Sequence, residues 1–192
     1  MNTMIKGSNG ITLVPAETRL LSDRKVFIEG EITASSACEF VRAVMLLVKE
    51  SVDKPIDVYI NSPGGEVNAG LLIYDTMKSI DIEINLHCIG MAASMAAIIF
   101  AGGKMGHRYI TPHGQVMIHE PLIVGGLGGS ATSIMRSAES VMEMKKLTVE
   151  LLSADTHRSR EEVEAAISYD NTMNAEAAVA FGICDSIEYS IV

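Results

Sequence analysis

The sequence has little cysteine and no CxxC pair, because Cys38, Cys88 and Cys184 are an odd, widely spaced set in 192 residues. Such a set excludes a disulfide framework and is typical of small buried side chains in a reducing compartment. No two histidines have the spacing of a zinc protease, and no acidic cluster resembles a site for a hard cation. We therefore predict no metal and no other cofactor.

Basic residues are also in the minority, since 15 lysines and arginines stand against 24 aspartates and glutamates, giving a formal charge of −9. This balance disfavours nucleic acid and anionic membranes as partners. The first ten residues lack the apolar run of a signal peptide. The apolar stretch from Cys88 to Gly103, about 16 residues, is shorter than the roughly 20 that cross a bilayer. A cytoplasmic protein is the prediction.

Apolar residues are abundant: they make up 48% of the chain, and the mean hydropathy is +0.26. A chain of 192 residues is long enough to bury a substantial core as one domain. Both values are high for a monomer in water, so we expect additional surface that packs against other subunits.

Hydrophobic periodicity predicts alternating strands and helices. Strands are expected at 25–32, 56–60, 82–89, 115–118 and 183–187. Helices are expected from cap residues 33–36 to about 49, and at 67–79, 131–154, 159–167 and 174–181. Residues 1–18 indicate a flexible arm or a hairpin. The strand–helix–strand crossovers predict a parallel α/β fold, and the long helix at 131–154 predicts a segment that projects onto a partner.

One hydroxyl, that of Ser94, lies in the middle of the apolar stretch. The pattern predicts a strand that ends near Ile89, a turn at Gly90, and a helix that begins near Ala92 or Ala93. Ser94 would then lie in the first helical turn, where unpaired backbone N–H groups favour developing negative charge. The alternative is a serine that caps the helix or bonds a backbone carbonyl.

Two further polar residues stand at the ends of apolar segments. His119 follows the predicted strand 115–118, and Asp170 lies between the last two predicted helices. Nucleophilic catalysis needs a hydroxyl, an imidazole and a carboxylate, and their order in the chain is free. The alternatives are an ordinary strand-end histidine for His119 and a helix N-cap for Asp170.

Stabilising a tetrahedral intermediate requires an oxyanion hole as well. Gly64 and Gly65 can turn their backbone N–H groups inward because no Cβ is in the way, and the N–H of Met95 is a second donor. The alternative is that the glycines only form a tight turn.

The other four histidines carry no such pattern. His107, His113 and His157 lie in polar segments and are expected to be solvated or at an interface. His87 alternates within a predicted strand and is expected on its outer face.

Together these segments resemble the ClpP family, the proteolytic subunits of the caseinolytic protease. The matching segments cover about residues 19–188. They are YINSPGG (59–65), AGLLIYDTM (69–77), GMAASMAA (90–97), VMIHEPL (116–122) and MNAEAA (173–178). The interval of 25 residues from Ser94 to His119 also matches the family.

The resemblance implies a ClpP/crotonase-type α/β fold, with a single protease domain over 19–192 and a handle at about 123–155. Residues 1–18 would be a flexible arm or axial loop. Seven-membered rings would stack in pairs through the handles and enclose a chamber. The implied partners are an AAA+ unfoldase and the unfolded proteins or peptides that it delivers.

The resemblance also implies the role of each candidate residue in a serine endopeptidase. Ser94 would be the nucleophile, His119 the general base and then acid, and Asp170 the residue that orients His119. Gly65 and Met95 would be the oxyanion donors.

The chain departs from the family pattern in two places. Ser168 and Tyr169 replace an Asp–Arg pair that joins the rings, which predicts a weaker or differently made ring–ring contact. Asp57 replaces an aromatic residue of the unfoldase-docking cleft, which favours an alternative, a regulatory or second-paralogue subunit of a mixed ring. A crotonase-type acyl-CoA enzyme is a further alternative, but such enzymes use acidic residues and need no Ser94–His119 pair.

Overall fold

A mostly parallel sheet forms the centre of the molecule. The computed structural model describes residues 1–7, 10–123, 125–126 and 128–191. The main path of the sheet, all parallel, runs β3-β4-β5-β6-β9; β7 pairs in parallel with the end of β5, and β8 pairs antiparallel with β7. The strands are β3 (Lys25–Ile32), β4 (Ile56–Gly65), β5 (Ile84–Ala93), β6 (Arg108–Ile110), β7 (Gln115–Ile118), β8 (Asn171–Met173) and β9 (Ser186–Ile187). The predicted α/β class with parallel crossovers is confirmed.

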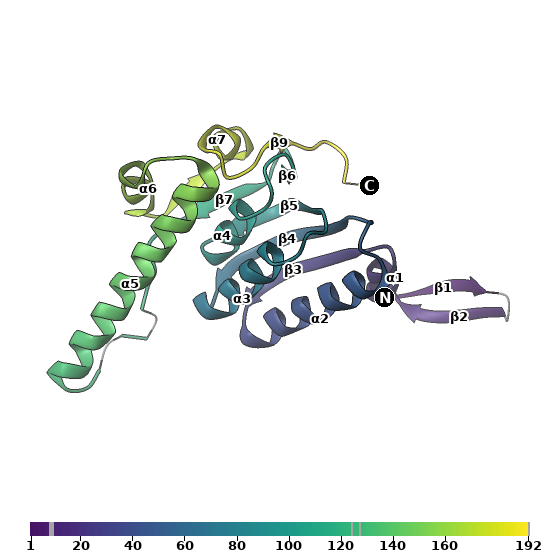
Figure 1. The fold of residues 1–192 in the computed structure, drawn as a ribbon, viewed down its shortest axis with the longest axis horizontal. Helices are drawn as coiled ribbons and strands as arrows, with labels where there is room; N and C mark the ends of the chain where they lie inside the picture. Colours follow the sequence, from purple (N-terminus) through teal and green to yellow (C-terminus); the bar gives the residue numbers. More distant parts are fainter. Residues whose placement is uncertain (8–9, 124, 127, 192) are drawn as a thin grey trace.

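Three helices cover one face of this sheet (Figure 1). They are α2 (Ala34–Glu50), α3 (Val67–Lys78) and α4 (Met95–Ala101). Helix α2 begins where the sequence predicts, because the side chains of Thr33 and Ser36 bond each other's backbone N–H groups in a capping box. Every residue of α4 is buried, so this short helix forms the middle of the core.

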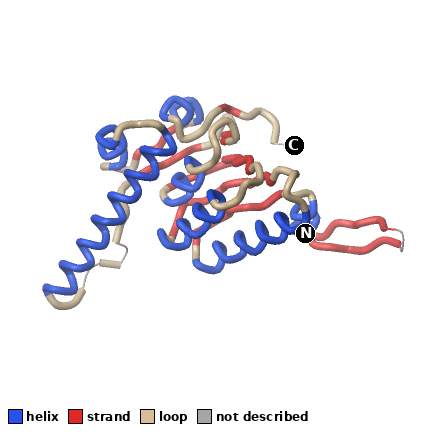
Figure 2. Tube along the Cα trace, viewed as in Figure 1, coloured by secondary structure: helices blue, strands red, loops and turns tan. Residues whose placement is uncertain are grey.

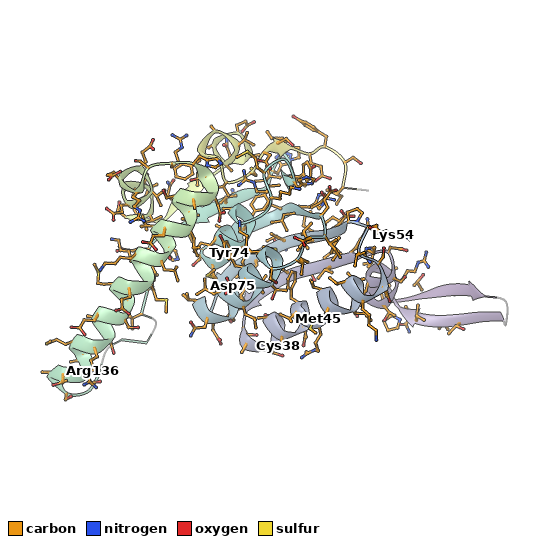
Figure 3. All side chains as sticks on the ribbon, viewed as in Figure 1. Cys38, Met45, Lys54, Tyr74, Asp75 and Arg136 are labelled. Carbon is orange, nitrogen blue, oxygen red and sulfur yellow. The ribbon has the colours of Figure 1, made fainter. Side chains whose placement is uncertain are left out.

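A long helix, α5 (Ala131–Thr156), projects from the body beside α6 (Arg160–Ile167) and α7 (Ala175–Phe181) (Figure 1). Its last turns are anchored, since Asp155 accepts hydrogen bonds from Tyr74 and Lys78 of α3, both at 2.9 Å. The first half of α5 is exposed, and Arg136 lies near its outer end (Figure 3). The predicted long helix is confirmed, whereas residues 124 and 127 of the predicted handle lie outside the described residues.

The N-terminal segment forms a hairpin and a short helix. Strands β1 (Asn2–Gly7) and β2 (Gly10–Pro15) pair antiparallel and project at the opposite end from α5, as Figure 2 shows. Ser8 and Asn9, part of the predicted hairpin turn, lie outside the described residues. The helix α1 (Ala16–Ser22), which leads into β3, has no counterpart in the prediction.

Two strands run further than the sequence predicted. β4 was expected to end at Ile60 and continues to Gly65, and β5 was expected to end at Ile89 and continues to Ala93. Glycine-rich segments usually indicate a reversal of the chain, which is why the strands were predicted to end there. In the structure these glycines lie in irregular extended backbone, and the register shifts between β4 and both of its neighbours. The three-residue strands β6 and β8 were missed because they are too short to show a period.

An ion pair packs against the apolar core. Arg108 is 2% exposed and holds the Asp185 carboxylate at 2.6 Å, so it joins β6 to the segment before β9. Among the cysteines, Cys88 and Cys184 are buried as predicted, and burial raises their pKa values to about 11 and about 12. The prediction was wrong for Cys38, which is exposed on α2 (Figure 3). Within the described residues, no helix is both long and apolar enough to cross a bilayer.

The other face of the sheet carries a ladder of four rings, one from each of four neighbouring strands. Phe27, Tyr59, His87 and Tyr109 stack with centroids 4.9–5.3 Å apart. His87 is thus on the face opposite the helices, as predicted, but its side chain is only 12% exposed.

His87 lies between two carboxylates. Its Nδ1 is 2.7 Å from Oε2 of Glu188, and its Nε2 is 3.7 Å from Oδ1 of Asp57, beyond hydrogen-bond distance, so Asp57 acts as a nearby charge. Burial lowers the pKa of His87, but the two carboxylates outweigh it and the net pKa lies above the usual 6.5.

We expect His87 to stabilise the fold below pH 6.5 and to lose this contribution as the pH rises through its raised pKa, because the protonated ring pairs with Glu188. The thermal midpoint of His87→Gln should therefore fall further below wild type at pH 5.5 than at pH 8.5. The exposed His113→Gln is the matched control and should show no such trend. A deficit of His87→Gln that is equal at both pH values would contradict this.

Candidate active site

Backbone pairing at one end of the sheet brings the three predicted residues together. β5 ends in parallel register with β7, with Ala93 opposite Met117, and the N–H of Ser94 donates to the Met117 carbonyl at 2.8 Å. β7 is antiparallel to β8, with Ile118 opposite Asn171. The next pair in that register is His119 and Asp170, so the ladders carry all three side chains to one place.

The three side chains form a continuous chain of hydrogen bonds. Nε2 of His119 is 2.8 Å from Oγ of Ser94, and its Nδ1 is 3.1 Å from Oδ1 of Asp170. The side chain of His119 is 15% exposed, whereas that of Asp170 is 77% exposed. A carboxylate beside Nδ1 keeps the proton on that nitrogen, so Nε2 is free to accept from the hydroxyl.

Ser94 has a strained backbone. Its φ of 53° and ψ of −121° are rare for a residue other than glycine, and such conformations cost about 1–3 kcal/mol. It precedes α4, which begins at Met95 rather than near Ala92 or Ala93 as predicted. Ser94 is the N-cap residue of α4 by position, but its hydroxyl makes no capping hydrogen bond and lies 2.8 Å from Nε2 of His119 instead.

The predicted glycines lie against the serine. A Cβ on Gly64 would stand 2.8 Å from Cβ of Ser94 and 3.0 Å from the backbone nitrogen of Met95. Gly65 has a φ of 154° and approaches the backbone of Ile32 so closely that a Cβ would stand 2.2 Å from its carbonyl oxygen. Gly64 and Gly65 are thus the last two residues of β4, and we call this irregular end of the strand the glycine turn; only glycine fits at Gly64 against Ser94 and Met95 and at Gly65 against Ile32.

A comparison with protein families identifies the family to which the chain belongs. A family model described as Clp protease matches residues 8–190. The chain belongs to the Clp protease family. Its sheet and helices are those of a ClpP/crotonase-type fold, and the family is one of peptidases.

In this member of the Clp protease family, several supporting contacts were not foreseen. Oδ1 of Asn61 accepts the N–H of Met91 at 3.2 Å and so ties β4 to β5 just before Ser94. Beyond His119, the Glu120 N–H donates to the Ile167 carbonyl, and the Glu120 side chain pairs with Lys145 of α5. Asn61 was visible in the NSPGG segment, but a side chain that bonds a neighbouring strand gives no periodic signal.

The structure also bears on the alternative roles weighed for Asp170 and for two of the other histidines. The N-cap of α7 is Asn174, whose side chain accepts from the Ala177 N–H at 2.9 Å, so Asp170 is not a cap. His113 is exposed, as predicted for the polar segments, whereas Nδ1 of His107 is 2.9 Å from Oδ1 of Asn85. Across the described ranges, no group of three His, Cys, Asp or Glu side chains is arranged to hold a metal ion.

Gly64→Ala should destabilise the fold and abolish peptidase activity, because its Cβ has no room beside Ser94. Gly106→Ala is the matched control: it has a similar φ of 88°, but no atom lies within 4 Å of its Cβ. Backbone strain should cost about 1–3 kcal/mol in both variants. The clash should add about 1–3 kcal/mol in Gly64→Ala alone.

Denaturant unfolding and peptide turnover measure both effects. Gly106→Ala should keep its activity. A Gly64→Ala protein as stable and as active as Gly106→Ala would show that the glycine turn is not packed against Ser94.

Proposed function

We propose that this chain is the serine endopeptidase subunit of a Clp-type protease, working by acyl-enzyme chemistry. The observation that carries the proposal is the hydrogen-bonded series from Ser94 through His119 to Asp170, at 2.8 Å and 3.1 Å. Membership of the Clp protease family gives the substrate class, peptide bonds. The three unpaired cysteines suit the predicted cytoplasmic location.

In the first half of the reaction, Nε2 of His119 takes the proton of the Ser94 hydroxyl as Oγ attacks the peptide carbonyl carbon. The imidazolium that forms keeps its Nδ1–H toward Asp170, which holds the ring in place. Nε2–H then protonates the leaving amine as the C–N bond breaks, and an ester on Ser94 remains. In the second half, Nε2 of His119 takes a proton from water as the water oxygen attacks the ester carbon; the bond from that carbon to Ser94 Oγ then breaks, Nε2–H returns the proton to Oγ, and the carboxylic acid product leaves.

The negative charge that develops on the carbonyl oxygen needs donors already in place. We assign the backbone N–H groups of Gly65 and Met95 to this role. Two features support the assignment: Met95 is the first residue of α4, so its N–H has no partner within the helix, and the glycine turn packs against it.

Ser94→Ala and His119→Ala should each reduce peptide turnover by at least about 10³-fold, because removing either member disables the whole set. Asp170→Asn should reduce peptide turnover by a smaller factor, because Ser94 and His119 remain. A fluorophosphonate should label wild type at Ser94 and not Ser94→Ala. The control is again His113→Gln, which should stay fully active.

The same experiment separates the rival functions. A crotonase-type acyl-CoA enzyme would resist the fluorophosphonate, and a non-catalytic ring subunit would show no turnover with wild type. Either result would overturn the proposal.

The proposed assembly is a pair of heptameric rings joined through α5 and fed by an AAA+ unfoldase. Apolar side chains on the projecting half of α5 support a buried contact there, since Met135 is 64% exposed and Met142 is 54% exposed in the single chain. Family membership supports ring assembly and an unfoldase partner in general.

Native mass measurement tests this assembly. Wild type should give about 290 kDa, fourteen times the chain mass of 20.6 kDa. The double variant Met135→Asp, Met142→Asp should give half that mass, because charged side chains oppose burial of the handle contact. An unchanged mass would place the ring–ring contact elsewhere, and a wild-type mass that requires a second paralogue would favour the mixed-ring alternative.

A further inference from the structure

Ser62 is a buried polar residue beside the active site that takes no part in the proposed acyl-enzyme chemistry. It is 1% exposed, and its hydroxyl donates to the Gly30 carbonyl at 2.5 Å. The same oxygen accepts the N–H of Gly64 at 3.1 Å. The hydroxyl therefore uses both its donor and its acceptor capacity, and it joins β3 to the glycine turn.

The strand pairing is irregular on both sides of Ser62. From the Glu29–Asn61 pair to the Glu31–Gly64 pair, β3 advances two residues while β4 advances three. From the Ile60–Cys88 pair to the Ser62–Ala92 pair, β4 advances two residues while β5 advances four. The ladder between β3 and β4 is thus interrupted between Asn61 and Gly64 and resumes at the Glu31–Gly64 pair, and the side-chain hydrogen bonds of Ser62 bridge this interruption.

The glycine turn, which packs against the nucleophile, is the end of β4 at which pairing with β3 resumes after this interruption. The backbone of Gly64 stands next to Ser94 and the nitrogen of Met95, as the lack of room for a Cβ shows. A shift of this turn would therefore move the Gly65 N–H relative to Ser94. Small displacements of such donors are costly, since about 1 Å can lower a rate about 10²-fold.

We propose that Ser62 is a positioning residue for the oxyanion hole. Its hydroxyl holds the Gly64 N–H and the Gly30 carbonyl together, and so fixes the turn at the position where the Gly65 N–H meets the developing oxyanion. This inference rests on the proposed serine endopeptidase function. It assigns Ser62 no contact with substrate.

The test compares ligands that do and do not form an oxyanion. A short peptide aldehyde adds to Ser94 Oγ to give a hemiacetal, whose oxygen occupies the oxyanion hole, whereas the corresponding peptide alcohol only occupies the substrate site. We expect Ser62→Ala to lower kcat about tenfold with KM unchanged within twofold. The affinity for the aldehyde should fall by a similar factor, and that for the alcohol should stay within twofold.

Thr156→Ala is the matched control. Thr156 is also a buried hydroxyl, and it donates to the Leu152 carbonyl within its own helix. Removing the Thr156 hydroxyl should lower the thermal midpoint without changing kcat or the ratio of aldehyde affinity to alcohol affinity. If Ser62→Ala does not fold, Ser62→Cys, which keeps a weaker donor and acceptor, is measured in its place. Its kcat and its affinity for the aldehyde should also fall, while its affinity for the alcohol should not.

The outcomes separate this inference from the function on which it rests. If wild type shows no peptide turnover, or if aldehyde binding survives the Ser94→Ala substitution, both the proposed function and the role of Ser62 are overturned. An active wild type whose Ser62 variant keeps its kcat, or loses aldehyde and alcohol affinity equally, overturns only the role of Ser62.

Discussion

The pairing of one strand with two successive partners is the constraint on which the geometry of the candidate site depends. β5 pairs with β6 over Leu86–Cys88 and with β7 over Met91–Ala93. The second pairing extends past the end of the strand through the bond from the Ser94 N–H to Met117. Backbone ladders, which do not depend on the side chains they carry, thus place the serine and the histidine. Substituting either side chain should leave the positions of the others unchanged, so their effects on activity can be interpreted chemically.

The strained conformation of Ser94 persists because its surroundings leave it no alternative. α4 is buried from Met95 to Ala101, and burial of side chains such as Phe100 contributes about 1.5–3 kcal/mol each. Summed over the large side chains of α4, these contributions exceed the cost of about 1–3 kcal/mol for one residue with an unfavourable φ. On the other side, the glycine turn fits against Ser94 with no room for a Cβ. Packing on both sides therefore holds the hydroxyl toward His119.

Periodic features of the fold were predictable from the sequence, and irregular ones were not. Helices α2, α3 and α5 have long apolar stripes and recognisable starts, and their bounds came out within about two residues. The continuation of β4 through NSPGG and of β5 through Gly90 was missed, since glycine signals a local turn and long-range pairing overrides that signal.

The candidate site shows the same division. Ser94, His119 and Asp170 could be named because their chemistry is distinctive: Ser94 is the one hydroxyl inside an apolar stretch, and the other two stand where predicted elements end. Asn61 and Ser62 could not, because their importance lies in bonds to neighbouring strands at shifts of register, which no local pattern encodes. Residues that hold a site together are thus harder to predict than residues that could perform the reaction.

The exposure of Asp170 decides how it can act on His119. With its side chain 77% exposed, water screens its charge, and the Coulombic attraction alone is weak. A hydrogen bond to Nδ1 remains directional under such screening, so the carboxylate acts through orientation and choice of tautomer. Its own position comes from the pairing of β8 with β7, one residue away. The end of the sheet, rather than the strength of an ion pair, therefore keeps the imidazole aimed at Ser94.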